Sequence, residues 1–240
     1  MSGHSKWHSI KHKKAATDAA RGKILTKHAK ILTIAARGNA NPETNATLRA
    51  AISNAKSDGV PKNNIEKILK KAAGEKNGDN FSEQIYEGFG PAGIAFIVTA
   101  LTDNPNRTFP SVRTAFSKNG GTLGSSGSVA FLFDRVGVIL IENDEKKEDE
   151  IFEIAIDAGA ENFIFDENGQ SEILTKFENL AAVREKIAEK ISVKKSEIQF
   201  RAKDPKIISD EKILAQIEKF VAAIEEIDDV DEIFGAFDVE

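Results

Sequence analysis

Hydrophobic positions in the first third of the chain recur at the spacing of amphipathic helices. One helix face is formed by four residues at positions i, i+3, i+4 and i+7, namely Leu48, Ala51, Ile52 and Ala55. An earlier helix is predicted over residues 15–37, and a later one begins at Pro61, which suits a first helical turn. Three such helices with short connections predict a small bundle, and the polar, glycine-rich residues 74–80 predict a linker after it.

Beyond residue 80 the pattern changes to short strands that alternate with helices. Strands are predicted over residues 94–101, 128–133, 136–142, 162–166, 172–176, 197–202 and 231–237. Helices are predicted over residues 107–118, 147–158, 180–190 and 211–226. From residue 136 to residue 202 the order is β-α-β-β-α-β, which is the ferredoxin-like motif. The flanking elements resemble a second α+β sandwich that the first one interrupts.

These patterns predict an α+β protein of three domains. A helical bundle occupies residues 1–76, and a discontinuous α+β domain occupies residues 80–133 and 205–240. A ferredoxin-like α+β domain over residues 134–204 is inserted into it, and the discontinuous domain is expected to be ferredoxin-like as well.

Composition narrows the class of protein. The 240 residues are 40% hydrophobic and 30% charged, which allows both a core and a polar surface. There is no Cys, so thiolate metal sites, disulfides and thiol nucleophiles are excluded. The longest apolar runs are too short to cross a bilayer, and the first thirty residues lack the apolar region of a secretory signal. A cytoplasmic protein with no membrane association is therefore expected.

Charge is divided unequally along the chain. Residues 1–76 contain 13 Lys and 3 Arg against 5 acidic residues, a net charge of +11. The other 164 residues carry a net charge of −16, and all four His lie in the basic part. So steep a division indicates a basic module that meets a polyanion, attached to an acidic body that does not.

Candidate nucleic-acid contacts lie in this basic part. The first 14 residues form a basic arm, expected to order only on a partner. On the helix that follows, four cations fall within about 80° of one another and form a basic stripe. The predicted nucleic-acid-binding residues are Lys6, Trp7, Lys11, His12, Lys13, Lys14, Arg21, Lys23, Lys27, Lys30 and Arg37. Lysine and arginine bind phosphates through counterion release, and Trp7 offers a ring on which a base can stack. The alternative is a solvated basic face with Trp7 in the bundle core.

Several longer motifs resemble those of the YebC/PmpR family. In the basic part they are Gly3–Trp7 (GHSKW), Ile10–Ala16 (IKHKKAA), Arg21–Ile24 (RGKI) and Pro61–Ile65 (PKNNI). Further along they are Tyr86–Pro91 (YEGFGP), Asn106–Thr108 (NRT), Asn119–Gly121 (NGG) and Gly127–Phe131 (GSVAF). The chain departs from the family at Asn39-Ala40, where a Gly pair is usual, and at Ala92, where Gly is usual. These departures affect turns and not charge.

The resemblance implies a three-domain protein without known enzymatic activity. Bacterial members of the family are described as transcriptional regulators that bind DNA. A related mitochondrial protein is a translational activator, and some members are linked to the relief of ribosome stalling. The resemblance therefore implies a role in gene expression, and leaves DNA and ribosomal RNA open as the polyanion.

Other polar clusters give weaker signals. Asn104, Arg107 and Asn119 form a secondary polar loop, for which helix capping by Asn106 or Thr108 is the simpler interpretation. The spaced glycines of residues 121–127 could cradle a phosphate, but they precede a strand and not a helix, so a flexible turn is favoured. The His residues at 4, 8 and 12 lie among lysines that would repel a divalent cation. Neither a metal nor a cofactor is predicted.

The sequence thus predicts a non-enzymatic regulator of gene expression that binds DNA. The alternative is a ribosome-associated RNA-binding translation factor that relieves stalling or activates translation. A third class is a scaffold whose basic domain meets an acidic protein. No small-molecule substrate is expected, and a protein partner is expected to bind through the acidic α+β domains.

Overall fold

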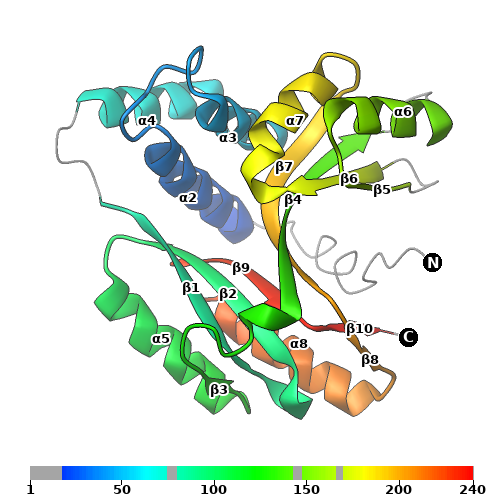
Figure 1. The fold of residues 1–240 in the computed structure, drawn as a ribbon. Coiled ribbons are helices and arrows are strands. Elements are labelled where there is room, and N and C mark those ends of the chain that lie inside the picture. The colour runs from blue at the N-terminus through cyan, green and yellow to red at the C-terminus, as the bar shows by residue number, and fades with distance from the viewer. Residues whose placement is uncertain (1–17, 75–79, 143–147, 166–169, 240) are drawn as a thin grey trace. The chain divides into compact units, whose positions relative to one another are not determined.

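The computed structural model describes residues 18–74, 80–142, 148–165 and 170–239 (Figure 1). The chain divides into two compact units. The first contains Met1–Lys30, Asn77–Asp134 and Phe200–Glu240, and the second contains Ile31–Lys76 and Arg135–Gln199.

Among the described residues of the basic part, three helices form, as predicted. They are α2 (Asp18–Ala35), α3 (Ala46–Ser57) and α4 (Lys62–Gly74). The Asn45 side chain caps α3 by accepting a hydrogen bond from the Leu48 amide, and it also donates to the Ala35 carbonyl at the end of α2. This single amide therefore fixes the turn between two helices.

The first unit is built on a four-stranded sheet with the order β3-β1-β2-β9. Its strands are β1 (Ser82–Phe89), β2 (Ala95–Thr102), β3 (Thr122–Leu123) and β9 (Val230–Gly235). Helices α5 (Pro105–Lys118) and α8 (Glu211–Glu225) cover one face of the sheet, as Figure 1 shows in green and orange. Their contact with β2 buries the rings of Phe96, Phe116 and Phe220, which pack 4.8–4.9 Å apart. A two-stranded parallel pair, β8 (Lys206–Ile208) and β10 (Phe237–Val239), completes the unit.

The second unit contains a sheet with the order β5-β6-β4-β7. Its strands are β4 (Phe133–Glu142), β5 (Asn162–Ile164), β6 (Gln170–Lys176) and β7 (Val193–Ala202), with α6 (Glu148–Ala158) and α7 (Leu180–Ala188) between them. Numbered from β4, this is the strand order 4-1-3-2 read from the β7 edge, so the predicted ferredoxin-like motif is confirmed. Ile139, Ile173, Ile151 and Ile187 are fully buried between sheet and helices.

Side chains of α3 hold it to this ferredoxin-like part within the second unit. Arg49 forms an ion pair with Glu185 of α7 and donates to two backbone carbonyls of the α2–α3 turn. The Asn54 amide exchanges two hydrogen bonds with the backbone of Ser196 in β7, as a neighbouring strand would. These contacts satisfy backbone groups of the outer strand that no further strand pairs.

Some predicted elements differ from the structure. Residues 128–133 do not form a separate strand; a 3-10 turn, Ala130–Leu132, leads directly into β4. Strands β1, β3 and β8 were not predicted, and the strand predicted over residues 231–237 is interrupted at Ala236. β1 pairs with β2 along its whole length through the turn after Gly90, so a cross-strand partner stabilises a segment whose own pattern is weakly apolar.

The α+β class is confirmed, and the boundaries of the three domains stay a prediction. Helix α2 passes from one compact unit into the other at Lys30–Ile31, so compactness alone does not separate a helical domain. The first unit's sheet also has a different strand order from the second, because the additional hairpin strand β1 lies between β2 and β3.

Candidate nucleic-acid interface

The lysines of the predicted stripe lie on one side of α2. This side faces residues 225–232, which run from the end of α8 into the start of β9, and both segments belong to the first unit. A cavity of about 600 Å³ lies between them, lined by Lys23, Lys27 and Lys30 on one wall and by Asp228, Asp229, Asp231 and Glu232 on the other. Cations of the basic part therefore meet an acidic run that lies about 200 residues later in the sequence.

Lys27 is bound by two carboxylates of this run. Its Nζ lies 2.6 Å from Glu232 Oε1 and 3.0 Å from Asp231 Oδ1. Burial by itself would lower the pKa of Lys27, but the charges of Glu232 and Asp231 outweigh that effect and raise it. Lys27 therefore keeps its proton, and its charge is compensated inside the protein.

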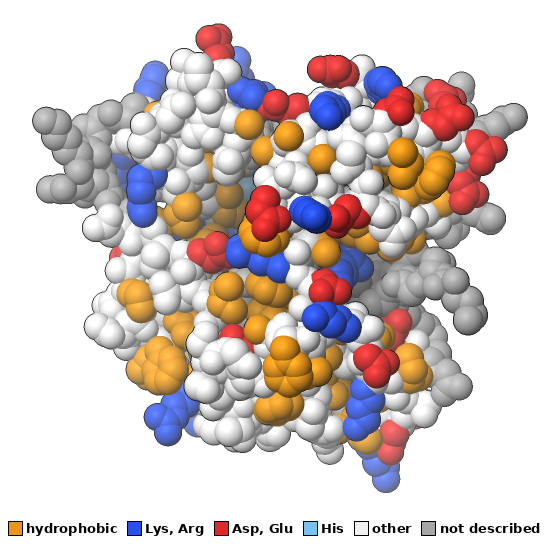
Figure 2. Space-filling view, in the orientation of Figure 1, with side chains coloured by type: hydrophobic (Ala, Val, Ile, Leu, Met, Phe, Trp, Pro, Cys, Tyr) orange, Lys and Arg blue, Asp and Glu red, His pale blue; other side chains and the backbone are white. Residues whose placement is uncertain are grey.

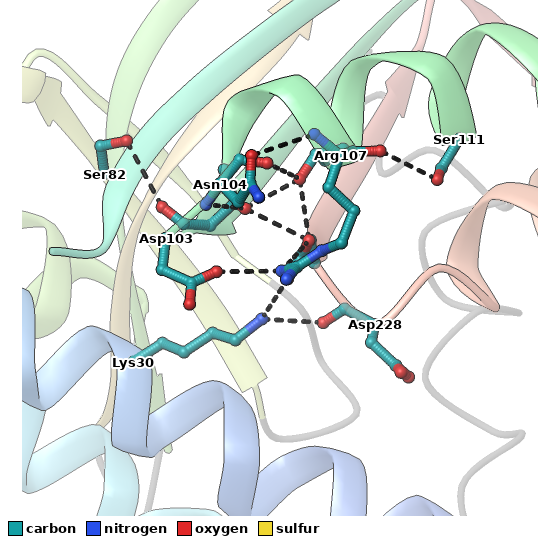
Figure 3. A network of polar contacts seen from close by, with 10 residues as sticks. Lys30, Ser82, Asp103, Asn104, Arg107, Ser111 and Asp228 are labelled. Atoms are coloured by element: carbon teal, nitrogen blue, oxygen red, sulfur yellow. Dashed lines mark hydrogen bonds and ion pairs between the residues drawn. The ribbon is translucent and has the colours of Figure 1, made fainter. Parts of the chain in front are cut away.

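Lys30 is still more enclosed, with only 8% of the residue exposed. Its Nζ lies 3.0 Å from Asp229 Oδ1 and donates to the Asp228 carbonyl, also at 3.0 Å; Figure 3 shows the side chain pointing from α2 toward Asp228. The ammonium also lies 5.8 Å from the centre of the Phe81 ring. A buried lysine with these partners anchors α2 to the loop.

Asp229 is the centre of a larger polar network. Its Oδ2 accepts hydrogen bonds from Thr102 Oγ1 (3.2 Å), Thr108 Oγ1 (2.8 Å) and Arg107 Nη2 (3.0 Å), in addition to the Lys30 contact at Oδ1. Burial would raise the pKa of Asp229, but the bonds from Lys30, Arg107 and Thr108 lower it to about 2. Burial, together with this negative charge, raises the pKa of the Tyr86 hydroxyl.

The predicted secondary polar loop is largely explained by this network and by helix capping. Asn104 is the N-cap of α5 and accepts from the Arg107 amide, so the cap lies two residues before Asn106. Arg107 reaches back to Asp103 and Asp229, as Figure 3 shows for Asp103. Asn119 follows the last turn of α5 and donates to the Ala115 carbonyl. These three residues therefore stabilise the start and the end of one helix.

Backbone N–H groups at and just after the end of the glycine-rich segment form an anion cradle, and a carboxylate of the chain itself fills it. Glu87 is buried, and its two oxygens accept N–H groups from Gly127, Val129 and Ala130 at 2.8–2.9 Å. Burial raises the pKa of Glu87, but these three bonds outweigh it and lower the pKa. Gly127 has φ +83°, a conformation that favours glycine. The cradle shapes a turn and does not leave its N–H groups for a phosphate.

Exposed cations lie on the other helices of the basic part. On α4, Lys67, Lys70 and Lys71 lie on the side opposite Ile65 and Leu69, and all three lysines are exposed. Lys56 near the end of α3 is exposed as well. These four lysines are not among the predicted contact residues, although their charge and helical spacing can be seen in the sequence.

The predicted contact residues thus fall into three groups. Lys6, Trp7, Lys11, His12, Lys13 and Lys14 lie outside the described residues, as does the Arg21 side chain. Lys27 and Lys30 are paired with acids. Lys23 and Arg37 are exposed, and Lys23 Nζ donates to the Glu225 carbonyl at 3.2 Å. The stripe is therefore not a continuous solvent-facing surface in this structure, because the acidic run of residues 228–232 covers its middle.

Two properties of the described residues bear on other classes of site. Among these residues, no helix is both long and apolar enough to cross a membrane. In the same part of the chain, no three His, Asp or Glu side chains gather in a way that could hold a metal ion. His4, His8 and His12 lie outside the described residues.

The chain is similar to known proteins over nearly its whole length. Residues 5–75 match the model of the TACO1/YebC protein N-terminal domain, and residues 81–237 match that of the TACO1/YebC second and third domain. A relative from Persephonella marina, named "Probable transcriptional regulatory protein", is 45% identical over 100% of this chain and 96% of its own length. A protein of the same description from Caldanaerobacter subterraneus is 44% identical over 100% and 99%.

A solved structure gives the same result at the level of the fold. The crystal structure of a conserved hypothetical protein from Aquifex aeolicus superposes with a TM-score of 0.86 at 42% identity, covering 98% of both chains. The similarity therefore extends over both compact units and is not confined to one conserved motif.

Proposed function

The chain belongs to the TACO1/YebC family, and on that premise we propose that it is a non-enzymatic regulator of gene expression that binds DNA. Its relatives are named as transcriptional regulators. The observation that carries the proposal is the segregation of charge, with +11 in residues 1–76 against −16 in the remainder. A soluble fold does not require such a division, whereas a protein that approaches phosphates with one part only does.

The structure supports two different roles for the cations of the basic part. Lys27 and Lys30 hold α2 to the acidic run of residues 228–232, so their role is to position the helix. The contacts to phosphate come from the arm, from Lys23 and Arg37, and from the exposed lysines of α4. Each phosphate contacted releases counterions, and this gain does not depend on base sequence. The proposed binding is therefore dominated by the backbone of the nucleic acid.

Titration of duplex DNA at several salt concentrations tests this proposal. Log Kd should change with log salt at a slope of about 0.9 per phosphate contacted, measured between about 50 and 200 mM salt. Replacing Lys67 and Lys70 with Glu should weaken binding and reduce the slope by about 2 if each contacts one phosphate. The matched control replaces Lys212 and Lys219, two exposed lysines of α8, with Glu. A slope that is the same in both variants and in the wild type would refute a role for α4.

The arm requires its own variant, since it lies outside the described residues. Replacing Lys11, Lys13 and Lys14 with Glu should reduce the slope by about 3 if each lysine meets one phosphate. If this variant and the α4 variant both bind as tightly as the wild type, the basic part is not the interface.

A second candidate function is an RNA-binding translation factor that associates with the ribosome. It is favoured by the same observation, because lysines that read phosphates without reading bases bind RNA as well as duplex DNA. Competition decides between the two. Duplex DNA and ribosomal RNA are titrated at one salt concentration, and co-sedimentation with ribosomes is measured for the wild type and the arm variant. Tighter binding of duplex DNA without co-sedimentation with ribosomes supports the DNA-binding function. Tighter binding of ribosomal RNA, with co-sedimentation that the arm variant loses, supports the translation factor.

A further inference from the structure

Helix α6 presents apolar side chains to solvent on the side away from its own core. Ile151, Ala155 and Ala158 are buried against the sheet of the second unit. One turn apart on another side, Phe152 and Ile156 are each 49% exposed. Residues four apart on a helix are neighbours on its surface, so the two side chains form one continuous apolar area.

This area continues onto the adjacent strand. The Phe152 ring lies 6.4 Å from that of Phe163 in β5, and Phe163 lies 6.2 Å from Phe165. Both of these phenylalanines are half-buried. We call the surface formed by Phe152, Ile156, Phe163 and Phe165 the α6 patch. β5 is the outer strand of its sheet, so the α6 patch lies at a sheet edge.

Other exposed large apolar residues of the described chain are placed differently. Two of them, Ile85 and Phe89, lie four residues apart on the extended strand β1, so they are not neighbours as residues four apart on a helix are. The others each lie on a different element, namely Phe109, Phe131, Ile198 and Ile207. Isolated exposed apolar side chains are ordinary on protein surfaces, whereas a contiguous patch rimmed by polar residues is typical of an interaction site.

The rim of the α6 patch is acidic. From Glu148 to Glu161 the chain has six carboxylates and no Lys or Arg: Glu148, Asp149, Glu150, Glu153, Asp157 and Glu161. Figure 2 shows orange side chains bordered by red ones over the part of the surface that α6 forms in Figure 1. The described side chains at the helix start and along its outer side are exposed.

Helix stability explains only part of this rim. Carboxylates in the first turn interact favourably with the positive end of the helix dipole, which accounts for Glu148, Asp149 and Glu150. Asp157 lies in the last turn, where a negative charge is unfavourable and where α6 has no basic residue. The ion pairs of Asp157 with Lys190 (3.7 Å) and of Glu161 with Lys176 (3.8 Å) are exposed and long. Pairs of this kind contribute little to stability.

We propose that the α6 patch is a docking site for a basic amphipathic helix of another protein. Apolar anchors of that helix cover Phe152 and Ile156, and its lysines and arginines face the carboxylate rim. Nucleic acid does not fit this surface, because six carboxylates repel phosphates. A second copy fits poorly as well, because a two-fold interface would place each acidic rim against itself. The inference does not depend on the DNA-binding proposal, since the α6 patch lies outside the basic residues 1–76.

A synthetic peptide supplies a defined probe for the full-length protein. It is a fluorescently labelled helix of about 18 residues, roughly five turns, with leucines along one face and lysines beside them. A second peptide of identical composition has the leucines distributed around the helix. We expect the first peptide to bind more tightly than the second, and its affinity to fall as salt is raised.

Paired variants assign the binding to the α6 patch. Replacing Phe152 and Ile156 with Ala should weaken binding by about tenfold or more, as loss of central apolar anchors does. The control is Phe131→Ala, which removes an aromatic ring that is 66% exposed in the other unit. Replacing Glu148, Asp149 and Glu153 with Gln, Asn and Gln should make the affinity for the peptide less dependent on salt concentration. The control replaces two exposed carboxylates of α8, Glu211 and Glu218, with Gln.

Three results would overturn the proposal. One is equal affinity of the Phe152/Ile156 variant and the Phe131 variant, and another is equal binding of both peptides to the wild type. The third is a dimer in sedimentation velocity that the Phe152/Ile156 variant loses, because the occupant would then be a second copy. Thermal melting of each variant verifies folding, and Ile156→Lys gives a second disruption at an exposed position if the double variant is unstable.

Discussion

Replacing Asp229 with Asn should destabilise the protein strongly at neutral pH and less strongly in acid. The wild-type carboxylate receives hydrogen bonds from Lys30, Arg107, Thr102 and Thr108 and is only 11% exposed at its side chain. An amide at this position loses the charge and directs an NH2 donor toward groups that are themselves donors. The Lys30 ammonium then stays buried without the carboxylate that balances its charge, next to the Asp228 carbonyl and the Phe81 ring.

The magnitude follows from the pKa of Asp229, which the native structure lowers from 3.8 to about 2. Each pKa unit corresponds to about 1.4 kcal/mol, so ionisation of this residue contributes about 2 kcal/mol at pH 7. Removing one member of a buried ion pair costs about 3–5 kcal/mol in proteins, because the other charge stays buried. We therefore expect the free energy of unfolding to fall by about 2–4 kcal/mol at pH 7.

The sign of the pH dependence follows from the direction of this shift. Because the native pKa is lowered, the stabilisation is complete above the unfolded value of 3.8 and is lost as the pH falls toward 2. At pH 3 about half of this stabilisation remains. The difference in the free energy of unfolding between wild type and variant should therefore be about 1 kcal/mol smaller at pH 3 than at pH 7.

Urea unfolding at both pH values measures these differences. The control is Asp134→Asn, whose side chain is 63% exposed and pairs with Lys203 at 3.5 Å. An exposed pair of this kind should change stability by less than about 1 kcal/mol. A difference for Asp229→Asn that is the same at pH 3 as at pH 7, or no larger than that of the control, would refute the assigned role of Asp229.

Three further substitutions test local features of the fold. Glu87→Gln should lower the free energy of unfolding by about 2–3 kcal/mol at pH 7, because the Gln amide cannot accept hydrogen bonds from all three N–H groups. Hydrogen exchange at the Gly127 amide should accelerate, and an unchanged exchange rate would contradict the role of Glu87 in the cradle. Gly88→Ala should lower the melting temperature, since its Cβ would lie 2.5 Å from the Thr122 carbonyl oxygen, whereas an unchanged melting temperature would mean that β3 yields at no cost. Ala92→Gly should stabilise by about 0.5–1 kcal/mol, because Ala92 has φ +56°; a destabilised variant would show that chain entropy outweighs that strain.

Helices and the second sheet were predictable because their signals are local. The spacing of Leu48, Ala51 and Ala55 places three side chains on one face, and all three are buried in the structure. The order of elements after β4 also suffices to identify the ferredoxin-like motif, since its connections are short. Strand β1 was missed because its stability comes from pairing with β2 and not from its own apolar pattern.

The candidate site shows the limit of sequence reasoning most clearly. The lysines of α2 and the acids of residues 228–232 were each visible as charged runs. Nothing in either run reveals that Lys30 and Asp229 meet, because about 200 residues separate them. For the glycine-rich segment the sequence favoured a flexible turn over a phosphate cradle, and only the fold shows that Glu87 accepts backbone N–H groups there.

What the sequence determined by itself is therefore periodicity and the distribution of charge: which segments form helices, which form the sheet of the second unit, and which end of the chain is basic. What only the tertiary structure decided is which of those charges face solvent. Side-chain periodicity depends on residues within one or two turns, whereas the burial and pairing of a charge depend on segments that folding brings together from distant parts of the chain.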